Sequence, residues 1–210
     1  MKIITVTTLA IFLLSVNISF AQMTKSIQEY PAQAEDISPL LIGETIANMT
    51  LPDAQGNNIQ IGGLFAEKPT ILIFYRGGWC PYCNLQLSGL QEIEKELVSL
   101  GYQLVAVSTD KPENLRASIE KGKLTYALLS DADLSLAKAT GIVFVAPKSY
   151  HNFLPESSGG KNKDMLLPVP SIFILNKKGE IRFEYIEPNF KERIPPNLLK
   201  AAASALKNNL

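Results

Sequence analysis

The chemistry of this chain centres on its only two cysteines, Cys80 and Cys83, which lie three positions apart in the segment GGWCPYC. A thiolate attacks either an oxygen of a peroxide, becoming a sulfenic acid, or a sulfur of another disulfide. The second thiol then displaces hydroxide or the bound thiol and closes an intramolecular disulfide. The spacing therefore indicates a dithiol–disulfide cycle.

A metal site and a structural disulfide are the alternatives for this pair. Tetrahedral zinc normally takes four protein ligands, and the only histidine, His151, lies far along the chain from the two thiols. A disulfide that closes so short a loop contributes little stability on the loop-entropy account. We therefore expect redox use of the thiols, with no metal and no cofactor.

Four residues beside the cysteines are candidates for supporting roles. Pro81 limits the freedom of the backbone between the thiols. Trp79 and Tyr82 can shield the pair and offer a hydrophobic surface to a substrate, or they can pack as ordinary aromatic residues. Arg76 can stabilise a thiolate or bind an anionic substrate, or it can close the edge of a sheet with a salt bridge.

The elements around the cysteines follow from the apolar pattern. An apolar run starts at Thr70 and stops at Gly77 and Gly78, and after the cysteines apolar residues recur at helical spacing until Gly101. This pattern predicts a buried strand that leads into the first turn of a long amphipathic helix. Unpaired N–H groups and the positive dipole end at a helix N-terminus favour ionisation of a thiol.

The rest of the chain alternates strands and helices. The sequence predicts strands over residues 102–108, 124–129, 171–175 and 180–186, helices over residues 112–121, 134–140 and 197–207, and an N-terminal hairpin over residues 47–51 and 58–61. A tight-turn signal at residues 176–179 makes the last two strands antiparallel. We therefore expect an α/β fold in which helices cover both faces of a central mixed sheet.

Residues 143–168 form a long connection before the last two strands. The middle of this segment, APKSYHNFLPESSGGKNKD, is polar and broken by proline and glycine, so we expect no regular element there. Two interpretations stay open. The segment lies beside the cysteines and shapes access to them, or it is a mobile surface insertion.

Residues 1–21 are predicted to be a secretory signal peptide. Lys2 precedes an apolar core shorter than the ~20 residues that a membrane span needs, and the small residues Ser19 and Ala21 favour cleavage after Ala21. Residues 22–39 are polar and are expected to be an irregular lead-in that can dock on the surface. A single domain is then expected over residues 40–210, in the periplasm and without stable membrane insertion.

The charge balance bears on the classes of partner to be expected. Removal of residues 1–21 leaves 19 basic and 20 acidic side chains. The net charge therefore gives no reason to expect nucleic acid or an anionic membrane as a partner. It does not specify the oligomeric state.

Three segments make the chain resemble the AhpC/TSA, or redoxin, group of peroxiredoxin-like proteins: FYRGGWCPYC at 74–83, LLSDADLSLAKATGI at 128–142 and VPSIFILNKKGEIRF at 169–183. The resemblance covers about residues 40–210 and implies the three-layer thioredoxin-like fold. It also implies that Val169 and Pro170 are the cis-proline dipeptide of that fold, which faces the two cysteines and contacts the backbone of the substrate.

The resemblance supports two registers, which differ in the cysteine that attacks first. On the peroxiredoxin Q-type pattern FYPxxxTPxC, Cys83 falls on the peroxide-attacking cysteine. Arg76 then replaces a proline and Cys80 replaces a threonine, while Pro170 stands where an arginine usually stabilises the peroxide. On the thioredoxin and glutaredoxin pattern, Cys80 is the more exposed nucleophile and Cys83 resolves. The order of attack stays open.

Two enzymatic functions and one non-enzymatic function are consistent with these features. The family resemblance favours an exported thiol peroxidase that reduces hydroperoxides through Cys80 and Cys83. The missing threonine and arginine favour a thioredoxin-like oxidoreductase that acts on protein disulfides, and the presence of both cysteines disfavours a mere binding domain. Either enzyme needs electrons from a thioredoxin-like donor in an oxidising compartment.

Overall fold

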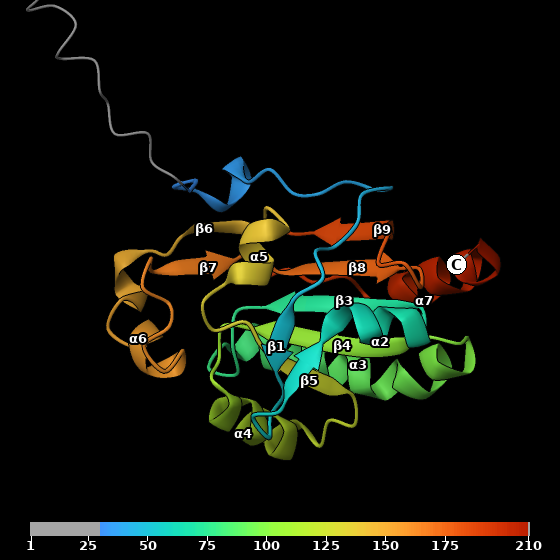
Figure 1. Ribbon diagram of the computed structural model, residues 1–210, viewed down its shortest axis with the longest axis horizontal. Helices are drawn as coiled ribbons and strands as arrows, with labels where there is room; N and C mark the ends of the chain where they lie inside the picture. The colour runs from blue at the N-terminus through green and yellow to red at the C-terminus, as the bar shows by residue number, and fades with distance from the viewer. Residues whose placement is uncertain (1–29, 210) are drawn as a thin grey trace, which may run out of the picture.

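The fold is built on a five-stranded mixed sheet with the strand order β5-β4-β3-β8-β9 (Figure 1). The computed structural model describes residues 30–209. Strands β3, β4 and β5 are parallel, whereas β8 runs antiparallel to both β3 and β9. The bounds of these strands are β3 Thr70–Tyr75, β4 Gln103–Ser108, β5 Ala127–Ser130, β8 Ser171–Leu175 and β9 Ile181–Ile186. The predicted central mixed sheet is confirmed.

Strand β3 is the middle strand, and all six of its residues are buried. Alternate side chains enter two different cores, because successive residues of a strand point to opposite faces. Ile71, Ile73 and Tyr75 enter the core that also contains Cys80 and Cys83, which we call the dithiol-side core. Leu72 and Phe74 enter the opposite core. A short, continuous apolar run is the pattern expected of a strand covered on both faces.

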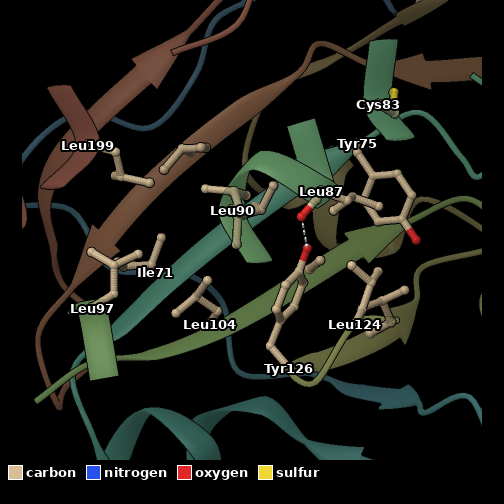
Figure 2. Close-up of a cluster of buried hydrophobic side chains, with 14 of the residues drawn as sticks. Ile71, Tyr75, Cys83, Leu87, Leu90, Leu97, Leu104, Leu124, Tyr126 and Leu199 are labelled. Carbon is tan, nitrogen blue, oxygen red and sulfur yellow. Dashed lines mark hydrogen bonds between the residues drawn. The ribbon is translucent and has the colours of Figure 1, made fainter. Parts of the chain in front are cut away.

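Helices cover both faces of the sheet, as predicted. Leucines of α3 fill the dithiol-side core together with residues of α4 and α7, and Figure 2 shows Leu87, Leu90 and Leu97 of α3 packed against Ile71 and Leu104. Helices α2 and α5 contribute to the opposite core. The bounds are α2 Ile61–Glu67, α3 Pro81–Ser99, α4 Pro112–Gly122, α5 Ser135–Ala139 and α7 Pro196–Leu206.

Helix α2 was not among the predicted elements. The strand expected over residues 58–61 ends at Gln60, one residue earlier than predicted, and α2 begins at the next residue. Gly62 and Gly63 give this segment a poor intrinsic helix propensity. Tertiary packing compensates, since Ile61 and Phe65 lie one turn apart and are both buried in the opposite core. Gly62 also lies so close to Asn48 that an added Cβ would come within 2.6 Å of its side chain.

The N-terminal hairpin is confirmed with shorter strands, β1 Thr50–Pro52 and β2 Asn58–Gln60. Ahead of it, residues 30–39 follow the surface. The carbonyl of Pro31 accepts a hydrogen bond from Val145, and Tyr30 and Ile37 pack against the opposite core. This part of the chain therefore lies against the opposite core, and it contains one 3-10 turn, Ala34–Asp36. The predicted signal peptide lies outside the described residues.

The segment 143–168 contains more regular structure than predicted. Strands β6 Val143–Val145 and β7 Leu166–Pro168 pair with each other, and a 3-10 turn, Lys148–Tyr150, and the short helix α6, Leu154–Ser157, lie between them. The expectation of no regular element in its middle is wrong, because Leu154 is buried against Leu167 and supports the helix.

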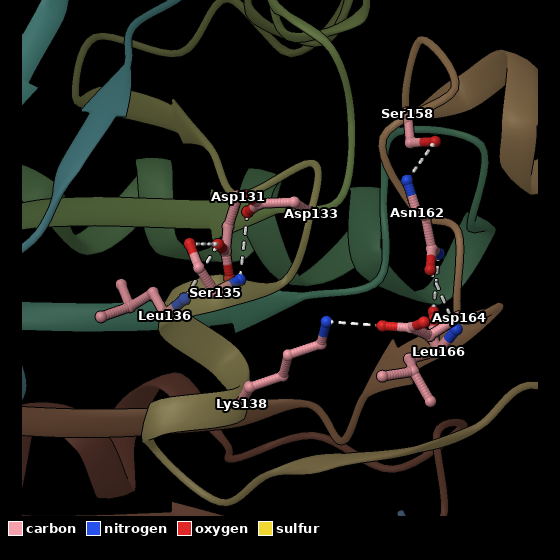
Figure 3. A network of polar contacts seen from close by, with 9 residues as sticks. All are labelled: Asp131, Asp133, Ser135, Leu136, Lys138, Ser158, Asn162, Asp164 and Leu166. Atoms are coloured by element: carbon pink, nitrogen blue, oxygen red, sulfur yellow. Dashed lines mark hydrogen bonds and ion pairs between the residues drawn. The ribbon is translucent and has the colours of Figure 1, made fainter.

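Side chains that bond to the main chain hold this segment together. The Asn162 amide bonds both the N–H and the carbonyl of Leu166, and Lys138 forms an ion pair with Asp164 (Figure 3).

The start of β5 also differs from the sequence analysis. The strand predicted over residues 124–129 begins only at Ala127, because α4 ends at Gly122, the next residue, Lys123, has a left-handed φ of 49°, and the chain must turn before it can join the sheet. None of the helices in residues 30–209 is long and apolar enough to cross a membrane.

Candidate active site

The two cysteines lie where β3 leads into α3. Cys80 is the residue that precedes the helix, Pro81 occupies the first helical position, and Cys83 lies in the first turn. Gly77 makes the connecting turn possible, because its φ of 148° is in the region that favours glycine and an added Cβ would lie 2.2 Å from Nε1 of Trp79. The prediction that the dithiol opens a long helix is confirmed.

Both thiols are free and buried, and their surroundings affect them in opposite ways. Hydrogen bonding to the Cys83 thiol lowers the pKa of Cys80 to about 6, and the charges of Arg76 and Arg193 act in the same direction. Burial raises the pKa of Cys83, whose side chain is 0% exposed. The arrangement therefore favours a Cys80 thiolate that accepts a hydrogen bond from a Cys83 thiol.

Arg76 is a buried cation enclosed by aromatic rings. Its guanidinium carbon lies 5.1 Å from the ring centroid of Trp79, 4.5 Å from that of Tyr150 and 4.3 Å from that of Phe190. Only 3% of the residue is exposed. No ion pair among residues 30–209 includes Arg76, so the salt-bridge interpretation is wrong for this part of the chain. The alternative that its charge favours a thiolate agrees with the lowered pKa of Cys80.

Trp79 and Tyr82 are half-buried and pack against the dithiol-side core. Trp79 also contacts Tyr150 and Phe153 of the segment 143–168, with ring centroids 5.7 Å and 4.8 Å away. Tyr82 contacts Phe190, which belongs to the connection between β9 and α7. Two segments that are distant in sequence therefore cover the dithiol, and the segment 143–168 lies beside the cysteines as one interpretation predicted.

Asp110 joins the turn before Cys80 to the segment 143–168. One carboxylate oxygen accepts a hydrogen bond from the N–H of Gly78, and the other accepts one from the hydroxyl of Ser157, both at 2.6 Å. Burial raises the pKa of Asp110, and these hydrogen bonds oppose that rise. A cavity of about 330 Å³ adjoins these residues and is also lined by Trp79 and Phe153.

Arg193 is a residue of the site that the sequence analysis did not identify. Its Nη2 lies 3.4 Å from Sγ of Cys83, and its Nε donates a hydrogen bond to Oε1 of Gln86. It comes from the irregular connection between β9 and α7, where no motif or period marks a functional residue. The sequence contains one indirect signal. Pro170 stands where the resemblance leads one to expect an arginine, so another segment of the chain could supply the positive charge to the site.

The prediction for Val169 and Pro170 needs correction. All peptide bonds among the described residues are trans, including the one between Val169 and Pro170. The N–H of Val169 donates to Ile142, and the carbonyl of Pro170 accepts from Glu187, so extended pairing holds the backbone on both sides of the bond. No hydrogen bond within residues 30–209 joins either residue to a cysteine.

His151 takes no part in the dithiol site, since its Nε2 lies 2.9 Å from the carbonyl oxygen of Ala146. In the part of the chain that the structure describes, no three His, Cys, Asp or Glu side chains come together in a way that could hold a metal ion.

Comparisons with known proteins connect this geometry to a family. Peroxiredoxin Bcp of Escherichia coli strain K12 is 32% identical over 106 residues, which are 50% of this chain and 67% of the relative. A putative peroxiredoxin of Haemophilus influenzae is also 32% identical over 106 residues, covering 50% of this chain and 68% of the relative.

Solved structures support the same fold. Peroxidoxin BcpB from Mycobacterium tuberculosis matches with a TM-score of 0.64 at 20% identity, over 80% of this chain and 97% of that one. Peroxiredoxin Q of Xanthomonas campestris matches with a TM-score of 0.61 at 19% identity, over 82% of this chain and 99% of that one. The model of the AhpC/TSA family matches residues 42–184. Because this match spans more than half of the chain, the chain belongs to the AhpC/TSA family.

Proposed function

We propose that this protein is an exported thiol peroxidase that reduces hydroperoxides through a cycle of Cys80 and Cys83. The observation that carries the proposal is the environment of Cys80, a thiol at a helix N-terminus whose pKa is lowered to about 6 beside the buried Arg76 cation. The relatives named as peroxiredoxins support peroxide as the oxidant.

In the first step, the Cys80 thiolate attacks one oxygen of the hydroperoxide. An S–O bond forms, the O–O bond breaks, and the alkoxide or hydroxide that leaves takes up a proton and departs as alcohol or water. Cys80 becomes a sulfenic acid. Cys80 is the nucleophile in this proposal because the thiolate is the reactive form and burial opposes ionisation of Cys83.

The second step closes a disulfide between Cys83 and Cys80, with loss of water. A thioredoxin-like donor then returns two electrons and two protons to the disulfide by thiol–disulfide exchange. We place this cycle in the periplasm, on the strength of the signal-peptide pattern in residues 1–21.

A protein dithiol–disulfide oxidoreductase is the second candidate. The specific observation in its favour is that Cys80, the nucleophile of the thioredoxin register, is the acidified thiol. The trans bond at Pro170 argues against it, because that register relies on a cis-proline to hold the backbone of a substrate peptide.

The discriminating experiment mixes the reduced protein with hydrogen peroxide and, separately, with a scrambled disulfide-bonded protein. The fluorescence of Trp79 and the products are followed in the wild type and in Cys80→Ser and Cys83→Ser. We expect a fast peroxide reaction that survives in Cys83→Ser and is lost in Cys80→Ser. Survival only in Cys80→Ser would make Cys83 the first nucleophile. Slow peroxide reaction together with mixed disulfides trapped on Cys80 would favour the second candidate.

A further inference from the structure

Arg193 is held in one position by every nitrogen of its guanidinium. Nε donates to Oε1 of Gln86 on α3, at 2.9 Å, and Nη1 donates to the main-chain carbonyls of Phe190 and Glu192. The remaining nitrogen, Nη2, points at a reacting atom, Sγ of Cys83, at 3.4 Å. An arginine anchored at its other nitrogens loses little conformational freedom when it binds a developing charge.

The surroundings of Cys83 explain why such a cation matters. Cys83 is fully buried, so water cannot stabilise its charged form, and burial raises its pKa. The charge of Arg193 acts in the opposite direction. No carboxylate within residues 30–209 forms an ion pair with Arg193, so its charge is available to the sulfur.

We propose that Arg193 is a catalytic residue of the second step, in which it stabilises Cys83 as a thiolate after Cys80 has become a sulfenic acid. The proposal rests on the proposed function. Before oxidation, the Cys83 thiol donates a hydrogen bond to the Cys80 thiolate. Once Cys80 carries the sulfenic oxygen, that anionic acceptor is gone, and Arg193 is the positive group in contact with Cys83.

The step balances in atoms and electrons. Cys83 releases its proton, which balances the proton that the departing hydroxide takes up, and its sulfur attacks Sγ of Cys80. The S–S bond forms, the S–O bond breaks, and the hydroxide that leaves takes up a proton and departs as water. The two thiol sulfurs together supply the two electrons that reduce the peroxide.

The first test separates the two steps in Arg193→Met. Sulfenic acid formation is measured by trapping with dimedone, and disulfide closure is measured by mass spectrometry after acid quench and alkylation. If the loss of the Arg193 charge raises the pKa of Cys83 by about one unit, the fraction of Cys83 present as thiolate falls about tenfold. Disulfide closure should then slow about tenfold. Sulfenic acid formation should change by less than about threefold, because Cys80 has other stabilising partners.

Two variants serve as controls for this measurement. Lys191→Met removes a neighbouring exposed cation from the same connection and should leave both steps unchanged. Arg193→Lys keeps the positive charge, but a lysine cannot contact Gln86 and Cys83 at the same time. The rate of disulfide closure in this variant should therefore lie between those of the wild type and Arg193→Met.

The second test does not require peroxidase activity. In Cys80→Ser, Cys83 is the only thiol, and its ionisation is titrated by ultraviolet absorbance with and without Arg193→Met. We expect the pKa of Cys83 to be higher in the double variant. The same comparison with Gln86→Leu, which frees Arg193 without touching the sulfur, should raise the pKa by a smaller amount.

Three results would overturn the proposal. The first is disulfide closure in Arg193→Met at the wild-type rate with the wild-type pH dependence. The second is an equal loss in both steps, which would indicate a structural role. The third is an unchanged Cys83 pKa in the Cys80→Ser background. If instead peroxide does not react with the wild type, the proposed function fails, while the titration still decides whether Arg193 acts on Cys83.

Discussion

At the scale of residues, the site consists of two thiols and two arginines that lack carboxylate partners among the described residues. Arg76 is buried among aromatic rings beside the turn, and Arg193 contacts Cys83. A buried cation without an anion is costly, and a thiolate is the anion that this site can supply. The reduced, ionised dithiol therefore offsets the cost of burying the charge of Arg76.

Replacing Arg76 by Met tests this reasoning at Cys80. The pKa of Cys80 should rise from about 6 by about half a unit to one unit, because a nearby positive charge is lost. The thiolate fraction then falls mainly below pH 7. The rate of Cys80 alkylation by iodoacetamide, followed by mass spectrometry as a function of pH, reports the change.

Arg182→Met is the matched control for this substitution. Arg182 pairs with Glu180 at the edge strand, with its side chain about one third exposed. Its removal should leave the alkylation profile of Cys80 where it is in the wild type. An unchanged profile in Arg76→Met as well would contradict the role given to Arg76.

At the scale of elements, periodicity and turn signals predicted the sheet, the long helix after the dithiol and the hairpin before β9. These elements are regular, and their apolar residues repeat with the period of the element. Helix α2 escaped prediction because packing around Ile61 and Phe65 overrides two glycines. Phe190 and Arg193 escaped because an irregular connection carries no period, and only the folded chain brings them to the dithiol.

Ser157 makes one of the contacts between the segment 143–168 and the turn before Cys80, beside those of Trp79 with Tyr150 and Phe153. Ser157→Ala removes one of the two hydrogen bonds that bring these segments together on Asp110. We expect the free energy of unfolding to fall by about 1–3 kcal/mol, since a buried carboxylate loses a donor. We also expect slower peroxide turnover, because Trp79 packs on the same segment.

Ser149→Ala provides the comparison within the same segment, because Ser149 is exposed. Urea unfolding should show a lower free energy of unfolding for Ser157→Ala than for Ser149→Ala, and peroxide turnover should be slower in Ser157→Ala. Equal stability and equal turnover in both would mean that the contact at Ser157 does not hold the segment in its working position, which favours the mobile-insertion interpretation.

The carboxyl group of Asp131, which lies just before the short helix α5, should make the folding stability depend on pH. Asp131 accepts a hydrogen bond from the N–H of Leu136 (Figure 3) and another from that of Ala137. Burial nevertheless raises the pKa of Asp131 to about 6. A folded-state pKa above the ordinary value of 3.8 means that the protonated form favours folding. That contribution is present below the ordinary value and is lost as the pH rises through about 6, by up to about 1.4 kcal/mol per pH unit.

Asp131→Asn should remove this dependence. The free energy of unfolding of the variant, relative to that of the wild type, should increase between pH 4.5 and pH 7, because only the wild type loses stability through this group. Urea unfolding at several pH values in this range measures the difference. A difference that stays constant with pH would show that Asp131 does not titrate in this range.

At the scale of the whole molecule, the dithiol is enclosed by segments from across the chain. The segment 143–168 covers it through Trp79, and the connection between β9 and α7 covers it through Tyr82 and Cys83. Both segments lie C-terminal to the strand–helix unit that carries the thiols. A complete site therefore requires the C-terminal third of the chain, although the cysteines themselves lie in the first half.

The compartment in which the protein works determines where its electrons come from. In an oxidising compartment the dithiol is converted to the disulfide, so turnover depends on an electron donor in the same compartment. If residues 1–21 are a signal peptide, the full-length chain expressed in a Gram-negative host should reach the periplasm and begin at Gln22. Intact mass and cell fractionation test both points. Ala21→Lys should block cleavage, since the processing site takes small residues, and should leave a longer, membrane-associated product. The export proposal is contradicted if the protein stays in the cytoplasm with residues 1–21 attached and Ala21→Lys has no effect. The electron donor of the cycle would then be a cytosolic protein.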